Sequence, residues 1–217
     1  MYLSRIKLNT SLRKTMQALA APNLIHGAIE DAELLNKTED QHDNERNRKL
    51  WRIDRLNGEW YLLVLSQDQI DFSPVANQFS GAPSFESKNY DGLINRVTNG
   101  SMWHFRIKAN PIVRKPSDEK GRGKIFAHTS IKYQEEWLKK QSVKNGFSLS
   151  DGEWLVTESK WYNFKKNKSE KQTIKLLSVT YEGILCVVDE DAFKKALKSG
   201  IGREKAYGLG LMTIVGV

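Results

Sequence analysis

The sequence predicts an α+β fold with antiparallel sheets, and three observations support it. The opening YLSRIKLN alternates apolar and charged residues, which is the pattern of a half-buried strand. The segment AAPNLIHGAIEDAELL repeats its apolar residues at helical spacing. Each half of the 217-residue chain also approximates a βαββαβ order of elements. Because that order defines the ferredoxin-like (RRM-like) unit, we expect two such domains in tandem.

The first predicted elements are a strand and two helices. Ile6 and Leu8 share the apolar face of the strand. Thr10 or Ser11 is expected to cap a short first helix, and Pro22 suits the first turn of a second one. The apolar face of this second helix gathers Leu24, Ile25, Ala28, Ile29, Ala32 and Leu35.

A strand pair and a connecting region complete the first half. LWRIDRL and EWYLLVLS flank Asn57-Gly58, a dipeptide that favours a tight hairpin turn. Residues 71–89 are rich in Ser, Pro, Asn and Gly and are expected to be connecting structure or a short irregular element. We therefore expect an N-terminal domain over 1–90 and a C-terminal domain over 91–217. No internal sequence repeat supports a duplication, so one irregular α+β domain is the alternative.

The second half begins with a strand, SMWHFRIKANP, that has a basic face. That face carries His104, Arg106 and Lys108, and the opposite face is apolar. The run VRKPSDEKGRGK predicts a loop, and IKYQEEWLKKQSV predicts a helix. GEWLVTESKWYNF and TIKLLSVTYEG predict two strands joined by a lysine-rich turn. The end of the chain is expected to form a strand, a helix, a glycine-rich loop and a strand.

Composition narrows the functional classes. The chain has 34 Lys plus Arg against 26 Asp plus Glu, a net charge of +8 that favours a polyanionic partner. It has no apolar window long enough to span a membrane and no signal peptide, so we expect a cytoplasmic protein. The single cysteine, Cys186, excludes a disulfide within the chain, and the four histidines lack metal-binding spacing. Neither a metal nor another cofactor is expected.

The lysine-rich turn is the strongest basic cluster. A narrow, positive hairpin suits a groove of structured RNA, whereas a solvated turn that protects a sheet edge is the alternative. The basic strand face and a second basic loop elsewhere in the chain favour the nucleic-acid interpretation. The lysines expected to bind RNA here are Lys160, Lys165, Lys166 and Lys168.

A glycine-rich segment near the C-terminus is the second basic loop. It fits neither a Walker A loop nor a dinucleotide-binding motif. Its glycines would let backbones approach closely, and Arg203 and Lys205 would face phosphate. The alternative is a helix C-cap followed by a tight turn, with both cations as ordinary surface charge. The glycines are Gly200, Gly202, Gly208 and Gly210.

His26 is the candidate catalytic residue. It projects from the polar side of the second helix, together with Glu30 and Glu33. An imidazole titrates near neutral pH, so it can accept a proton from a ribose 2′-hydroxyl or donate one to a departing 5′-oxygen. An ordinary surface histidine is the alternative.

Three segments resemble the CRISPR-associated endoribonucleases of the type I-E Cascade system, the CasE family of the RAMP superfamily. They are MYLSRIKLN with His26 after it, FRIKANPIVRK, and GIGREKAYGLGLMTIV, and they span the chain. The resemblance implies two ferredoxin-like domains. It also implies metal-independent cleavage of CRISPR repeat hairpins at the base of the stem.

The same resemblance implies roles for residues and partners. His26 matches the family's catalytic histidine, the hairpin lysines match its basic hairpin, and Gly200 to Gly210 match its glycine-rich loop. Some members carry a tyrosine where this chain has Asn23. The implied partners are precursor CRISPR RNA, its product crRNA and other Cascade subunits, with a monomer when the protein is free. A non-catalytic RNA-binding subunit is the alternative function.

Overall fold

The first half of the chain forms a four-stranded antiparallel sheet. A computed structural model describes residues 1–36, 49–116, 123–165 and 173–217. The elements of the first half are β1 (Tyr2–Leu8), α1 (Arg13–Ala20), α2 (Asn23–Asn36), β2 (Leu50–Leu56), β3 (Glu59–Ser66), α3 (Ser73–Ser80) and β4 (Glu86–Asn89). The strands lie in the order β2-β3-β1-β4, which is the ferredoxin-like order.

The second half repeats the same topology. After the short α4 (Asp91–Ile94) come β5 (Met102–Ala109), β6 (Ile112–Arg114), β7 (Ile125–Ala127), α5 (Ile131–Lys144), β8 (Phe147–Ser148), β9 (Trp154–Lys165), β10 (Thr173–Val187), α6 (Glu190–Ser199), the 3₁₀ turn η1 (Lys205–Tyr207) and β11 (Met212–Gly216). The antiparallel sheet has the order β11-β5-β10-β8, and β9 also pairs with β10. The predicted tandem of ferredoxin-like domains is confirmed.

Three local predictions were wrong. Residues 71–89 contain α3 and β4 and are not merely a connection. The residue that caps α1 is Leu12, without a side-chain hydrogen bond, and not Thr10 or Ser11. On α2 the predicted apolar face is buried except at its ends, where Leu24 is 42% exposed and Leu35 is 74% exposed.

Burial follows the alternation that the strands predicted. Ile6 and Leu8 of β1 are buried, and the charged residues that alternate with them, Arg5 and Lys7, are exposed. On β3 the two faces are buried differently: Leu62 packs in the core under α1, α2 and α3, and Leu63 packs in a second cluster with Leu211 of the other half. Both faces of the first sheet are therefore covered, which explains why EWYLLVLS is apolar without alternation.

The two sheets meet at a joint that buries charge. Arg52 of β2 is 1% exposed, and its Nη1 donates to the main-chain oxygens of Arg106 (2.6 Å) and Leu211 (2.8 Å). Its Nη2 also donates to Thr213 Oγ1 at 2.7 Å. Arg52 of the first sheet thus bonds to β5 of the second sheet, to β11 and to the residue directly before β11.

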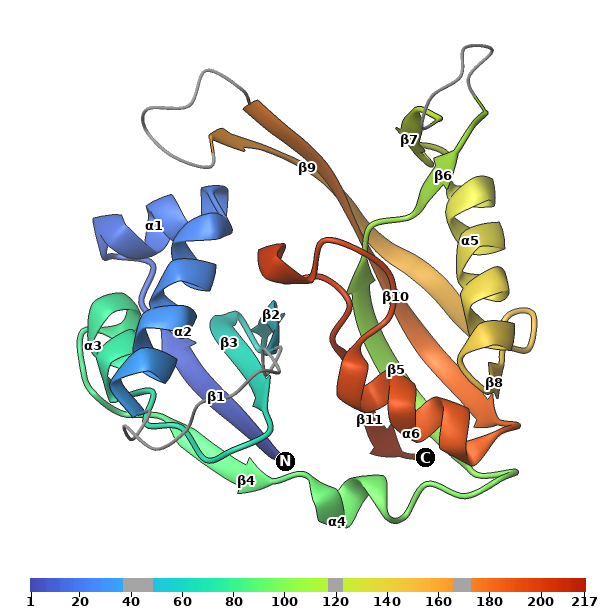
Figure 1. Ribbon diagram of the computed structural model, residues 1–217, viewed down its shortest axis with the longest axis horizontal. Helices are drawn as coiled ribbons and strands as arrows, with labels where there is room; N and C mark the ends of the chain where they lie inside the picture. Colours follow the sequence, from blue (N-terminus) through green and yellow to red (C-terminus); the bar gives the residue numbers. More distant parts are fainter. Residues whose placement is uncertain (37–48, 117–122, 166–172) are drawn as a thin grey trace.

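Figure 1 shows how the joint places the remaining elements. Helices α1, α2 and α3 lie on the side of the first sheet away from the second domain, and the red segment before β11 reaches across toward α2. The hairpin of β9 and β10 extends past α1 at the top of the view. Among the described residues, none of the helices combines the length and apolar character that crossing a membrane requires.

Candidate active site and nucleic-acid interface

His26 lies in the first turns of α2 on the side away from the core. Pro22 directly precedes the helix, and its carbonyl accepts a hydrogen bond from the main-chain N–H of His26 at 3.2 Å. Ile25 and Ile29 anchor the opposite face in the core. The His26 side chain is 38% exposed, and its Nδ1 lies 4.0 Å from Glu30 Oε1 one turn later. The imidazole is therefore both held by a rigid helix and accessible.

The His26 side chain lines an open groove of about 640 Å³. The walls of this groove come from both domains. Helix α2 forms one wall, Gln78 of α3 contributes to it, and Ala206 and Tyr207 of η1 belong to the second domain. The α2 residues that line it are Asn23, Leu24, His26, Gly27, Ala28 and Asp31. The structure thus brings the predicted histidine and the predicted glycine-rich segment together.

The glycines of that segment are used for close packing within the protein. Gly200 ends α6 at φ +74°, in agreement with a helix C-cap. A Cβ at Gly208 would lie 2.5 Å from Trp51, and one at Gly210 would lie 2.7 Å from the carbonyl oxygen of Ile201. Gly210 N–H also donates to the Lys108 carbonyl at 2.7 Å. The segment follows its path because these positions carry no side chain.

The two cations of the segment are placed differently from each other. Arg203 is exposed, as expected for a side chain that would face phosphate, and so is Gly202 beside it. Lys205 turns back, and its Nζ donates to the carbonyl oxygen of Ser199 near the end of α6 at 2.6 Å. Lys205 therefore stabilises a helix end, where a cation is favoured by the dipole.

An apolar cluster joins the basic hairpin to the groove. Phe164 of β9 packs against Tyr207 of η1, with ring centroids 5.2 Å apart and an interplanar angle of 69°. Leu176 of β10 and Leu209 complete the buried part of this cluster, and Ala21 before α2 packs on it. The turn end of the hairpin, the glycine-rich segment and the start of α2 thus meet beside the groove that holds His26.

The cluster lies near the turn end of the hairpin, since Phe164 pairs with Ile174 next to the last described pair of the two strands. Lys160 and Lys165 on β9 are exposed, so their charges are available to a ligand. Lys166 and Lys168, also expected to bind RNA, lie outside the described residues. Among the described lysines of the hairpin, Lys165 is therefore next to the apolar cluster at the groove, and Lys160 lies further along β9.

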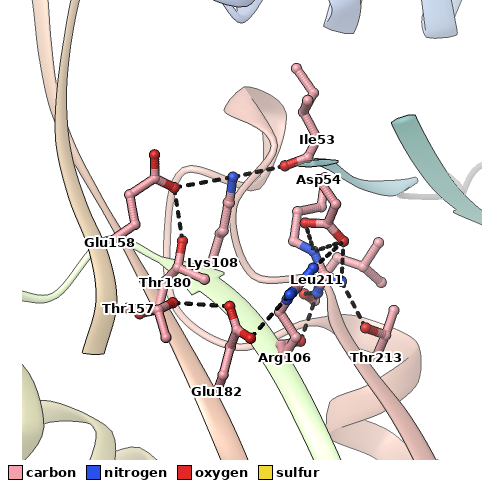
Figure 2. A network of polar contacts seen from close by, with 11 residues as sticks. Ile53, Asp54, Arg106, Lys108, Thr157, Glu158, Thr180, Glu182, Leu211 and Thr213 are labelled. Atoms are coloured by element: carbon pink, nitrogen blue, oxygen red, sulfur yellow. Dashed lines mark hydrogen bonds and ion pairs between the residues drawn. The ribbon is translucent and has the colours of Figure 1, made fainter. Parts of the chain in front are cut away.

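Arg106 and Lys108 lie in the joint between the sheets and are not free on a basic surface (Figure 2). Lys108 Nζ donates to the Ile53 carbonyl at 2.8 Å and lies 3.5 Å from Glu158 Oε2. Arg106 Nη2 donates to Glu182 Oε2 at 3.0 Å. Burial lowers the pKa of Lys108 and the two nearby carboxylates oppose that shift only in part. These cations are committed to internal partners, so the basic-face interpretation of β5 is corrected at both positions.

Sequence reasoning missed two features of this region. One is the buried pair of Arg52 and Asp54, for which the signal was two charges inside the apolar strand LWRIDRL. The other is Tyr207, an aromatic residue within a glycine-rich loop. Its ring packs against Phe164 in the apolar cluster, and the residue also lines the groove.

The fold and the groove define a class: a protein of two ferredoxin-like domains whose C-terminal glycine-rich segment completes a histidine-bearing groove on the N-terminal domain. The chain belongs to the CRISPR-associated protein family, which matches it over residues 1–215. The CRISPR-associated endoribonuclease Cse3 of Thermus thermophilus is 28% identical over 223 residues, which cover 99% of each chain.

Solved structures agree with this family. A CRISPR endoribonuclease Cse3 bound to a 19-nucleotide RNA matches with a TM-score of 0.79 and 25% identity, covering 99% of this chain and 100% of the other. Cas6e of Escherichia coli K-12 matches over 100% of both chains with a TM-score of 0.64. Its identity is 18%, so that likeness concerns the fold alone.

Proposed function

We propose that the chain is an endoribonuclease that binds the repeat stem-loops of precursor CRISPR RNA and cleaves at the base of the stem to release crRNA. The observation that carries this proposal is the groove that joins His26 to η1, with the turn end of the basic hairpin packed against η1. Family membership and the full-length similarity to an endoribonuclease support the same activity. Residues 1–90 would carry the histidine, and residues 91–217 the hairpin and glycine-rich segment.

The chemistry proposed for the groove is transesterification within the RNA. The 2′-oxygen attacks the adjacent phosphorus, the bond from phosphorus to the 5′-oxygen breaks, and a 2′,3′-cyclic phosphate and a 5′-hydroxyl result. The 2′-hydroxyl gives up one proton and the 5′-oxygen gains one, so no net proton is consumed. His26 serves one of these transfers, as general base or general acid. Because the nucleophile belongs to the substrate, the reaction needs no metal-bound water.

Binding of the stem is assigned to the exposed cations near the groove. Lys160 and Lys165 on β9 and Arg203 beside η1 are exposed, and Lys166 and Lys168 follow directly in the chain. Phosphate contacts of this kind position an RNA without reading its sequence. We further propose that the protein is a cytoplasmic monomer when free and joins other Cascade subunits together with its crRNA.

The test is His26→Ala on labelled repeat RNA, analysed on a denaturing gel. Cleavage should be abolished and hairpin binding retained, and a chelator should leave the wild-type rate unchanged. His104→Ala is the matched control, because His104 is also exposed but lies on β5 outside the groove. Full activity of His26→Ala would refute the assignment. Wild-type protein that binds the hairpin without cutting it would instead indicate a non-catalytic RNA-binding subunit.

A further inference from the structure

Tyr207 is the residue of the second domain that lines the groove and carries a polar side-chain group. It shares the groove with His26, although the two residues come from different domains and opposite ends of the chain. Ala206, the other η1 residue in the lining, has no polar side-chain atom. The groove therefore has an imidazole on one wall and a phenol on a wall that the other domain supplies.

The protein holds this phenol in place before any ligand arrives. Glu204 and Gly208 on either side of η1 have φ values of +60° and +78°, so the turn has a fixed shape. Gly208 packs on the ring of Trp51, and Phe164 of β9 packs against the Tyr207 ring. A donor that is already oriented stabilises developing charge without reorganising during the reaction, which is the condition for effective electrostatic catalysis.

The reaction requires such a donor. As the 2′-oxygen attacks, negative charge grows on the nonbridging oxygens of the phosphate. Among the described residues that line the groove there is no Lys or Arg, and Asp31 adds a carboxylate. A neutral donor in the lining can therefore contribute to the stabilisation, beside the exposed cations near the groove. An unperturbed phenol titrates at about 10 and so keeps its proton near neutral pH.

We propose that the Tyr207 hydroxyl donates a hydrogen bond to a nonbridging oxygen of the scissile phosphate, on the side of the groove that faces His26. The phenol keeps its proton throughout, so the transfers from the 2′-hydroxyl and to the 5′-oxygen are unaffected. This inference rests on the proposed endoribonuclease function. It gives the second domain a direct part in the chemistry as well as in holding RNA.

The first test is Tyr207→Phe, which removes the hydroxyl and keeps the ring that packs on Phe164. The single-turnover cleavage rate should fall by about 10²-fold, as for loss of one oxyanion donor. The affinity for repeat RNA, measured in the non-cleaving His26→Ala background, should change less than about 3-fold. Tyr162→Phe is the control, because Tyr162 packs against the same apolar cluster but does not line the groove.

A sulfur substitution separates this role from a structural one. Sulfur accepts hydrogen bonds poorly, so replacing the contacted nonbridging oxygen by sulfur should slow the wild-type enzyme, and Tyr207→Phe should lose most of that sensitivity. A wild-type rate in Tyr207→Phe, or an undiminished sulfur effect for both phosphorothioate isomers, would overturn the inference and leave the proposed function intact. Failure of the wild-type protein to cleave would instead overturn the proposed function itself.

Discussion

Arg52 and Asp54, two residues apart on β2, form a bidentate ion pair in the joint between the domains. Arg52 Nε donates to Asp54 Oδ1 at 2.8 Å, and Nη2 donates to Oδ2 at 2.7 Å. Both side chains are almost fully buried, with exposures of 1% and 3%. The carboxylate compensates the guanidinium charge, and the guanidinium is thereby free to bond to the second domain with its remaining hydrogens.

Removing the guanidinium is expected to loosen the joint. Arg52→Ala leaves Asp54 as a buried, poorly compensated carboxylate, and loss of one partner of a buried pair costs about 3 to 5 kcal/mol. The free energy of unfolding from urea titration measures this cost. Arg5→Ala is the control: its pair with Glu86 is exposed, so the loss should stay under about 1 kcal/mol. Equal losses in the two variants would contradict the role given to Arg52.

Asp54 should make the stability of the joint sensitive to acid. Burial tends to raise its pKa, but the combined effect of Arg52, Lys108 and Arg106 outweighs burial and holds the pKa below its ordinary value. A lowered folded-state pKa contributes stability that is fully present above about pH 4 and is lost as the pH falls through the folded value.

The comparison that isolates this effect is wild type against Asp54→Asn, unfolded by urea between about pH 6 and about pH 2. The variant should be less stable at neutral pH, because Arg52 loses its counter-charge, and its stability should decline less steeply in acid. Asp71, Asp151 and Glu190 also have lowered pKa values, so some acid dependence remains in the variant. Identical pH slopes would show that Asp54 does not contribute.

The hairpin lysines should account for part of the salt dependence of RNA binding. Each phosphate contact contributes about 0.7 to 0.9 to the slope of log K against log salt concentration. Replacing Lys165, Lys166 and Lys168 by Ala should therefore flatten the slope by up to about three such increments. Lys88→Ala is the control, since Lys88 is exposed on β4, the edge strand at the bottom of Figure 1. An unchanged slope in the triple variant would show that these lysines do not contact phosphate.

Gly208 should tolerate no side chain, because both its conformation and its surroundings exclude one. Gly208→Ala places a Cβ 2.5 Å from Trp51 at φ +78°. Gly58→Ala is a matched control with φ +83° and nothing within 4 Å of its Cβ, so it should cost only the conformational strain of about 1 to 2 kcal/mol. Overpacking should cost Gly208→Ala about 1 to 3 kcal/mol more. Its cleavage rate should also fall, because Tyr207 is adjacent.

The spacing of apolar residues predicted those strands and helices that bury only one of their faces. β1 and β5 alternate because one face of each packs in a core, and α5 and α6 follow helical spacing for the same reason. The sequence did not predict β4, because ESKN is an edge strand with little burial that is held by main-chain pairing with β1. It did not predict α3, because the buried residues of this helix are interspersed with Ser, Pro, Asn and Gln.

The sequence could identify candidate site residues by their type, but it could not predict which neighbours surround them in the fold. A polar face on α2 sufficed to single out His26. Arg106 and Lys108 are paired inside the protein with Asp54 and Glu158, respectively. These carboxylates are distant in the chain and come close only because the two sheets pack together. The place of Tyr207 depended on the path of the glycine-rich segment over Trp51. Tertiary neighbours of this kind leave no local pattern in a sequence.

The two walls of the groove, α2 and η1, are far apart in the sequence, so the groove is complete only after both have been synthesised and have packed together. Translation delivers His26 before Tyr207, so a nascent chain on the ribosome has the imidazole before it has the wall that completes the groove. Fragments left by premature termination or by a protease lack one wall or the other. A chain that contains α2 but not η1 therefore lacks the complete groove in which we propose that cleavage takes place.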